Sequence, residues 1–371
     1  MRKHIASHAA IRGITACMII IYHVREGALH LQPRLTHPQS MERWYLLVDI
    51  FFILSGFIIT YTTSPNGKPL DWEQSKRFWF SRITRIYPLH LFCTAMFLLM
   101  ASANALNALR KGAPLDPLWS MEGVGWVVQE ALLIQSVGIP GFRWLNPVTW
   151  SISAEMFAYV LFPLLLLATA RRSGILLLLS FSLAFYGWVF ATGEKLDMCY
   201  GLAPLRCLAA FIIGQAICLY RDFWERLSPG ACDALQMASV VGITAVTMLP
   251  VSDVYGIPCA ALLVAASWPD RGRIAAFLST RPLQYLGEIS YSLYLMHWLT
   301  LIAVTNVWIH LVSKLHLPYV VEQAGWIIAV PALSFPIAAL THHYIELPAR
   351  HHFKRRRDAT RVKVQPGLIT T

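Results

Sequence analysis

Long runs of apolar residues recur along this chain, from near residue 14 to near residue 345. A membrane-spanning helix needs about 20 mainly apolar residues, because each residue rises about 1.5 Å and the hydrocarbon core is about 30 Å thick. The runs therefore predict an all-α, polytopic membrane protein with about ten transmembrane helices. We place these helices at residues 5–24, 45–63, 86–104, 149–169, 174–191, 202–220, 233–249, 254–268, 285–311 and 325–345.

One further apolar stretch, residues 118–137, contains Glu122 and Glu130. Because carboxylates are costly in hydrocarbon, we interpret this stretch as interfacial or re-entrant, with a membrane span as the alternative. No linker is long enough to join a second folded unit, so we expect one membrane domain over residues 1–349. Residues 350–371 form a basic tail that is too short to fold alone.

Composition supports a membrane protein and excludes other classes. Hydrophobic residues make up 56% of the 371 residues and charged residues only 14%, with a mean hydropathy of +0.51. Soluble domains carry about 25% charged residues, so this chain has too few to cover a globule in water. An ordinary soluble enzyme, a disordered chain and a collagen-like fibre are all excluded.

The basic residues indicate how the chain is oriented. There are 31 Lys and Arg against 20 Asp and Glu, a formal net charge of +11. With the predicted spans and a cytosolic N-terminus, 22 of the basic residues fall on the cytosolic side and 8 on the other, while Arg206 lies within a span. Cytosolic loops are enriched in Lys and Arg, so both termini are predicted to be cytosolic. The same pattern accounts for the charge without a nucleic-acid partner.

Arg12 and His23 are the first candidate functional residues. They are eleven positions apart, which is three helical turns plus about 20°, so both project from one face of the first predicted helix, about 16 Å apart along its axis. Arg12 could hold an anionic group at the cytosolic end while His23 acts deep in the membrane. On spacing alone, Arg12 as a boundary anchor and His23 as a hydrogen-bonded core histidine remain an alternative.

Acidic residues could accompany His23. Asp49 begins the second span from the outer side, at a depth that His23 could share, and a carboxylate beside an imidazole fixes its tautomer and raises its basicity. Glu155 enters the fourth span from the same side; its structural alternative is an ion pair, with Arg206 as one candidate partner. His297, near mid-membrane in the ninth span, is by itself more often a structural residue.

Arg82 and Arg85 are candidates for binding phosphate. They lie one turn apart in SRITRIYP on the cytosolic side, and guanidinium groups bind phosphate oxygens in a bidentate manner. The alternative is ordinary anchoring of the helix at the membrane surface. No cluster of His, Cys and Asp has the spacing of a metal site.

Six segments form an ordered set of motifs from the first predicted helix to the last. They are AAIRGITACMIIIYH (9–23), VDIFFILSGFIIT (48–60), SRITRIYPLHLF (81–92), WSISAEMFAYVLFPLLL (150–166), YLGEISYSLYLMHW (285–298) and HYIELPAR (343–350). In order and spacing they resemble acyltransferase family 3, the integral-membrane O-acyltransferases that modify bacterial surface glycans. The resemblance covers the whole chain, in the form without a fused hydrolase-like domain.

The resemblance implies a function and a location. It implies an acyltransferase of the bacterial cytoplasmic membrane, with residues 1–349 as its acyltransferase domain. The acyl donor would be acyl-CoA, usually acetyl-CoA, entering from the cytosol, with no metal ion. The acceptor would be a sugar hydroxyl of a polysaccharide or lipid-linked glycan, such as an exopolysaccharide or O-antigen precursor.

The resemblance also implies roles for particular residues. Arg12 and His23 match the family's signature Arg and His, while Asp49 and Glu155 match its acidic residues in the second and fourth helices. His23, oriented by Asp49, would be the base, either on the acceptor hydroxyl directly or through an acyl intermediate. The catalytic set is thus His23, Asp49 and Glu155, and the donor-binding set is Arg12, Arg82 and Arg85.

One departure and two alternatives accompany this hypothesis. The family usually has an acidic residue three positions before the signature arginine, where this chain has Ala9, so Arg12 must find another partner. A proton-coupled transporter would also use buried His, Asp and Glu, although it would show repeated broken helices. A non-catalytic scaffold would tolerate alanine at His23.

Overall fold

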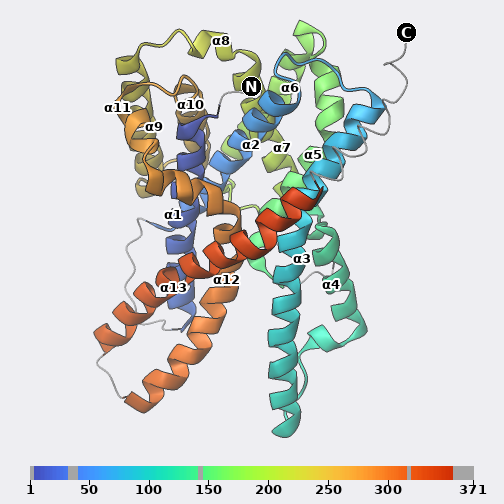
Figure 1. Cartoon of the computed structure of the whole chain (residues 1–371), viewed down its shortest axis with the longest axis vertical. Helices are drawn as coiled ribbons and strands as arrows, with labels where there is room; N and C mark the ends of the chain where they lie inside the picture. Colours follow the sequence, from blue (N-terminus) through green and yellow to red (C-terminus); the bar gives the residue numbers. More distant parts are fainter. Residues whose placement is uncertain (1–3, 32–40, 141–144, 316–318, 354–371) are drawn as a thin grey trace, which may run out of the picture.

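The computed structural model describes residues 4–31, 41–140, 145–315 and 319–353, and within these ranges it contains helices and no β-strand. The all-α prediction is confirmed. Figure 1 shows a central bundle from which two pairs of elements, α12 with α13 and α3 with α4, extend at the lower end of the view. The helices that overlap the predicted spans are α1 (Ala6–Leu31), α2 (Leu47–Thr63), α3 (Trp72–Arg110), α5 (Trp150–Thr169), α6 (Arg172–Thr192), α7 (Ala203–Leu219), α9 (Pro229–Met248), α10 (Gly256–Ala266), α12 (Arg281–Leu315) and α13 (Tyr319–Thr341).

Each of the ten predicted spans lies on one of these helices. Among the described residues, seven helical segments are long and apolar enough to cross a membrane, and α7 and α10 are apolar but shorter. These features make the chain a multi-pass membrane protein. The segments are Ala6–Glu26, Trp44–Thr63, Trp72–Arg110, Pro147–Thr169, Ser173–Thr192, Pro229–Met248 and Ala324–Phe353.

Helix α3 begins earlier than its apolar run predicts. Hydropathy places the span at 86–104, whereas the helix has 39 residues and begins at Trp72. A capping box explains this start: the Asp71 side chain accepts a hydrogen bond from the backbone N–H of Gln74 at 2.7 Å, and the Gln74 side chain accepts one from the backbone N–H of Asp71. Arg82 and Arg85 consequently lie on a helix, three residues apart and near the same face.

Residues 118–137 contain only short helices. Helix α4 (Met121–Leu132) has 12 residues and ends at Leu133, which adopts a left-handed conformation with φ of 56°. A single turn of 3₁₀-helix at Gln135–Val137 follows. Twelve residues rise only about 18 Å, so this segment is too short to span the membrane as one helix, in keeping with the interfacial or re-entrant interpretation.

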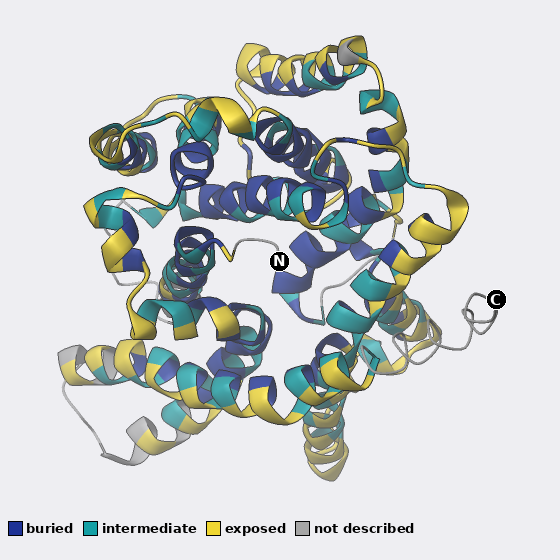
Figure 2. Ribbon diagram, turned by 45° about the horizontal axis from the view of Figure 1, so that its top comes forward, coloured by how far each residue is buried: buried dark blue, intermediate teal, exposed yellow. Residues whose placement is uncertain are grey.

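The centre of the bundle is α7, which packs most closely against α2. At their crossing, a Cβ atom added to Gly56 of α2 would lie 2.0 Å from the carbonyl oxygen of Phe211. A Cβ atom added to Gly214 of α7 would lie 1.9 Å from the carbonyl oxygen of Ile53. Only glycine permits this approach of two backbones. Figure 2 shows the buried residues gathered on the inner helices, with exposed residues on the periphery.

Helices α1 and α12 also pack closely, and they run parallel. A Cβ atom added to Gly13 would lie 2.6 Å from the backbone of Leu286, and one added to Gly287 would lie 2.4 Å from the carbonyl oxygen of Ala9. Eleven residues after Arg12, His23 meets α12 again, at His297. Small residues thus bring the backbones of the two helices together near their N-terminal ends.

The C-terminal helix returns to the start of the bundle. After α13, a π-helical turn (His342–Glu346) leads into further helix that runs to Phe353. The predicted boundary between domain and tail at residue 349 therefore falls inside a helix. Residues 354–371, most of the predicted basic tail, lie outside the described residues.

Candidate active site

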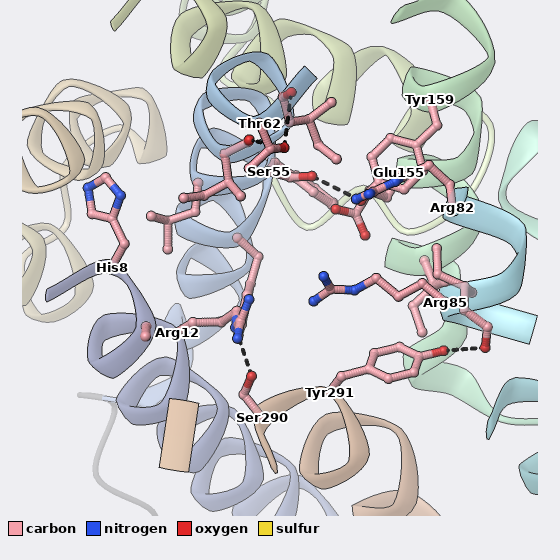
Figure 3. A pocket seen from close by; sticks show the side chains of 18 of the residues that line it. His8, Arg12, Ser55, Thr62, Arg82, Arg85, Glu155, Tyr159, Ser290 and Tyr291 are labelled. Carbon is pink, nitrogen blue, oxygen red and sulfur yellow. Dashed lines mark hydrogen bonds between the residues drawn. The ribbon is translucent and has the colours of Figure 1, made fainter. Parts of the chain in front are cut away.

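A cleft of about 370 Å³ lies between the first part of α1 and helices α2, α3, α5 and α12, and Arg350 of the C-terminal helix also lines it. Figure 3 shows the guanidinium groups of Arg12 and Arg85 directed into the same space, with Arg82 and Glu155 along one wall. The charged and histidine side chains that line the cleft are His4, His8, Arg12, Arg82, Arg85, Glu155 and Arg350. Four arginines against one glutamate make the cleft strongly basic.

Arg12 is held by neutral groups of α12. Its Nε donates a hydrogen bond to Ser290 Oγ at 2.8 Å, and its Nη2 donates one to the carbonyl oxygen of Gly287 at 2.7 Å. These bonds supply the partner that the missing acidic residue at position 9 left open. Ala9 itself lies against Gly287, so a larger side chain there would push the two helices apart. Because neither partner is a carboxylate, these hydrogen bonds orient the Arg12 guanidinium without neutralising its positive charge.

Arg82 and Arg85 line the cleft without forming an ion pair with a carboxylate in the described part of the chain. Arg82 has its guanidinium carbon 5.7 Å from the centre of the Phe78 ring and bonds to Ser81 Oγ. Among the ion pairs of the described residues, none involves Arg12, Arg82 or Arg85. Removing several guanidinium groups from water without counter-ions is unfavourable, so the cleft is suited to a ligand with several negative charges.

Arg350 joins this group from a motif that had no assigned role. Its Nη1 donates to Glu346 Oε1 at 3.2 Å. The other oxygen of Glu346 accepts hydrogen bonds from Ser292 Oγ at 2.8 Å and from His342 Nδ1 at 2.9 Å. The π-helical turn therefore fixes Glu346 against α12, and Glu346 in turn holds Arg350 at the cleft. The sequence pointed to Arg350 only through its position in the motif HYIELPAR, and it did not indicate which residues Arg350 contacts.

His23 lies outside this cleft and pairs with a second histidine. Its Nδ1 is 2.9 Å from Nε2 of His297, and the two rings stack with their centres 5.0 Å apart. The ring of Trp298 meets His23 edge-on at 5.2 Å. His297 is fully buried, and its Nδ1 lies 2.6 Å from the carbonyl oxygen of Tyr294. Sequence reasoning treated His297 as structural, although it belongs to the motif YLGEISYSLYLMHW.

Tyr294 links the cleft to the histidine pair. Its side chain lines the cleft beside Phe51, with ring centres 5.9 Å apart. Its hydroxyl is 2.7 Å from Ser151 Oγ and donates to the carbonyl oxygen of Val148, while its own carbonyl oxygen contacts His297. Tyr294 therefore lines the basic cleft and also contacts His297, the residue that contacts His23.

Asp49 does not accompany His23 in this structure. Its carboxylate forms a bidentate ion pair with Arg206, at 2.6 Å to Nη2 and 3.1 Å to Nε, and both side chains are buried. The Trp150 ring lies 5.3 Å from the Arg206 guanidinium carbon. The expected pairing of Asp49 with His23 is therefore corrected: a buried guanidinium requires a carboxylate, and Asp49 supplies it.

Glu155 is also placed differently from the expectation. It lines the cleft together with Arg12 and Arg82, whereas Arg206, its candidate structural partner, is occupied by Asp49. Figure 3 shows Glu155 beside Tyr159, whose hydroxyl is 3.1 Å from Ser55 Oγ. The structure brings Glu155 together with the predicted donor-binding arginines and not with His23. Its catalytic role stays a prediction.

Comparison with known proteins gives the family. The sequence matches the model of a family described as an acyltransferase domain over residues 8–342. It is 26% identical over 284 residues to acyltransferase MdmB of Streptomyces mycarofaciens, covering 69% of this chain and 68% of that protein. It is 25% identical over 372 residues to O-acetyltransferase OatA of Staphylococcus aureus, covering 92% of this chain.

The alignment spans 56% of the length of OatA, so the chain corresponds to little more than half of that relative. No solved structure matches the chain. The family match extends from the N-terminal part of α1 to the start of the π-helical turn after α13, and it includes Arg12, Arg82 and Arg85 of the basic cleft and both histidines. The resemblance drawn from the six motifs is thereby confirmed: the chain belongs to acyltransferase family 3 and is a bacterial, multi-pass membrane acyltransferase.

Proposed function

We propose that this protein transfers an acetyl group from cytosolic acetyl-CoA to a sugar hydroxyl on the outer side of the bacterial cytoplasmic membrane. The acceptor would be an exopolysaccharide or O-antigen precursor, free or lipid-linked. The observation that carries the proposal is the arrangement on α1: Arg12 lies in a basic cleft with Arg82 and Arg85, and His23 lies about 16 Å further along the same helix.

The cleft fits the charge of the donor. CoA carries a diphosphate and a 3′-phosphate, and arginine forks bind such oxygens in pairs. Arg12, Arg82, Arg85 and Arg350 would hold these phosphates, while the extended pantetheine arm runs past Tyr294 toward His23. The similarity to OatA, which is named as an O-acetyltransferase, favours acetyl as the acyl group and oxygen as the acceptor atom. A proton-coupled transporter is not favoured, because the matched family consists of acyltransferases.

The chemistry assigned to His23 balances without a metal ion. His23 takes the proton of the acceptor hydroxyl as its oxygen attacks the thioester carbonyl carbon. The C–S bond then breaks, and the imidazolium returns that proton to the thiolate. The products are an O-acetyl ester and CoA with a free thiol.

The function is tested by incubating membranes that contain the protein with radiolabelled acetyl-CoA. We expect label to enter the glycan fraction as an ester that mild alkali removes. Membranes without the protein are the control. Label that remains soluble, or that enters glycan equally in the control, would contradict the proposal.

The proposed orientation places both termini in the cytosol. The parallel packing of α1 with α12 supports the placement of both termini on one side of the membrane, because the first and ninth of ten spans cross it in the same direction, and the excess of Lys and Arg favours the cytosolic side. A reporter that is active only outside the cytosol should therefore be silent when fused after Thr371. An active reporter at that position would mean an odd number of spans.

The donor site gives a prediction for Arg85. A charge-assisted hydrogen bond contributes about 1.5–3 kcal/mol, so Arg85→Ala should raise the KM for acetyl-CoA about ten- to hundredfold. Arg77→Ala is the matched control, because Arg77 is exposed on the same helix and does not line the cleft. Protein abundance should be unchanged in both. Equal KM values in the two variants would reduce Arg85 to a membrane anchor.

A further inference from the structure

The pairing of His23 with His297 determines which nitrogen of His23 can accept a proton. The starting point is His297, whose Nδ1 lies 2.6 Å from the carbonyl oxygen of Tyr294. A carbonyl oxygen can only accept a hydrogen bond. His297 Nδ1 therefore carries a proton, and its direction of donation is fixed by the backbone of its own helix.

The charge state of His297 follows from its surroundings. Its side chain is completely buried, and its polar contacts among the described residues are the backbone carbonyl groups of Tyr294 and Leu293 and the imidazole of His23. None of these is a carboxylate, and an unpaired cation inside a membrane protein is costly. His297 is therefore neutral, with a lone pair on Nε2.

This lone pair orients the proton of His23. His297 Nε2 lies 2.9 Å from His23 Nδ1, so it accepts a hydrogen bond and places the proton of neutral His23 on Nδ1. The remaining nitrogen, Nε2, then holds the lone pair. An isolated neutral imidazole prefers the other tautomer, with the proton on Nε2, so the second histidine inverts the intrinsic preference.

We propose that His297 is a positioning residue that holds His23 in the Nδ1–H tautomer, and that His23 Nε2 is the atom that takes the proton of the acceptor hydroxyl. Only the role of His23 Nε2 in proton transfer rests on the proposed function, whereas the tautomer of His23 does not. The hydrogen bond also stabilises the imidazolium formed during transfer, because His297 Nε2 can accept from it as well. In this way His297 takes over the orienting function that the sequence suggested for Asp49.

Three substitutions at His297 separate this role from packing. The amide oxygen of glutamine reaches approximately the place of imidazole Nε2, whereas the amide of asparagine ends near the place of Nδ1. His297→Gln should therefore retain most of the transfer rate. His297→Leu and His297→Asn should lower kcat about 10- to 100-fold, as the loss of an orienting partner usually does. The KM for acetyl-CoA should stay within about twofold of the parental value, which corresponds to a small change in binding free energy.

The tautomer can be measured without any substrate, which keeps this inference separate from the proposed function. The probe is ¹⁵N NMR of membranes containing the full chain labelled with [¹⁵N]histidine, with the His23 signals identified by their loss in His23→Asn. The expected result is a protonated Nδ1 and an unprotonated Nε2 on His23, with the proton moving to Nε2 in His297→Leu. A His23 that carries its proton on Nε2 in the parent protein overturns the inference, as does equal loss of kcat in the glutamine and leucine variants.

Discussion

His23→Asn should insert into the membrane and bind acetyl-CoA, yet transfer almost no acetyl group. Asparagine is polar and no larger than histidine, so the site keeps its packing, but its amide cannot take up a proton at neutral pH. Loss of general-base catalysis lowers rates by about 10²–10⁴-fold. The measurement is the initial rate of glycan acetylation at saturating acetyl-CoA, normalised to the amount of protein in the membrane.

Two comparisons make this result specific. His343→Asn introduces the same chemical change at an exposed histidine of the C-terminal helix and should transfer at the parental rate. Acetyl-CoA affinity should be retained in His23→Asn, since His23 does not line the basic cleft. Substantial glycan acetylation by the His23→Asn protein would show that His23 is a packing residue.

The sequence was sufficient to predict the helices and which of their polar residues share a face. Hydropathy marks apolar stretches of the right length, and the period of 3.6 residues puts Arg12 and His23 on one face. Both follow from local chain geometry. The resemblance grouped Arg12, Arg82 and Arg85 as a donor-binding set, and in the structure these three residues line one cleft.

Partners across helices were beyond sequence reasoning. The sequence analysis paired Asp49 with His23 and named Arg206 as a candidate partner of Glu155, whereas the structure pairs Asp49 with Arg206. The choice is made by helix packing: Gly56 and Gly214 bring α2 against α7, which carries Arg206. No periodicity within one helix contains that information.

The same limit explains why His297 was undervalued. An imidazole in an apolar helix has many possible carbonyl partners, so a structural role was the simpler interpretation. Its contact with His23 depends on the parallel approach of α1 and α12, which the small residues Ala9, Gly13 and Gly287 permit. Their spacing was visible in the sequence, but which helix they would face was not.

Asp49→Leu should be strongly destabilising, which is a different outcome from that of a catalytic substitution. It leaves the Arg206 guanidinium buried without its carboxylate, and breaking a buried ion pair in this way costs about 3–5 kcal/mol. We expect a lower midpoint of thermal unfolding in detergent and less protein in the membrane. The molecules that do fold should retain catalysis, because His23 keeps its contact with His297.

A double substitution distinguishes the two roles of Asp49. Replacing a complete buried ion pair by apolar residues is often neutral or stabilising, so Asp49→Leu combined with Arg206→Met should recover much of the stability that Asp49→Leu loses. Transfer per folded molecule should recover with it, since neither residue would touch donor or acceptor. If the double variant folds well but its kcat stays about 10²-fold low, a deficit in the range of lost acid–base catalysis, then Asp49 acts in the chemistry despite its pairing with Arg206.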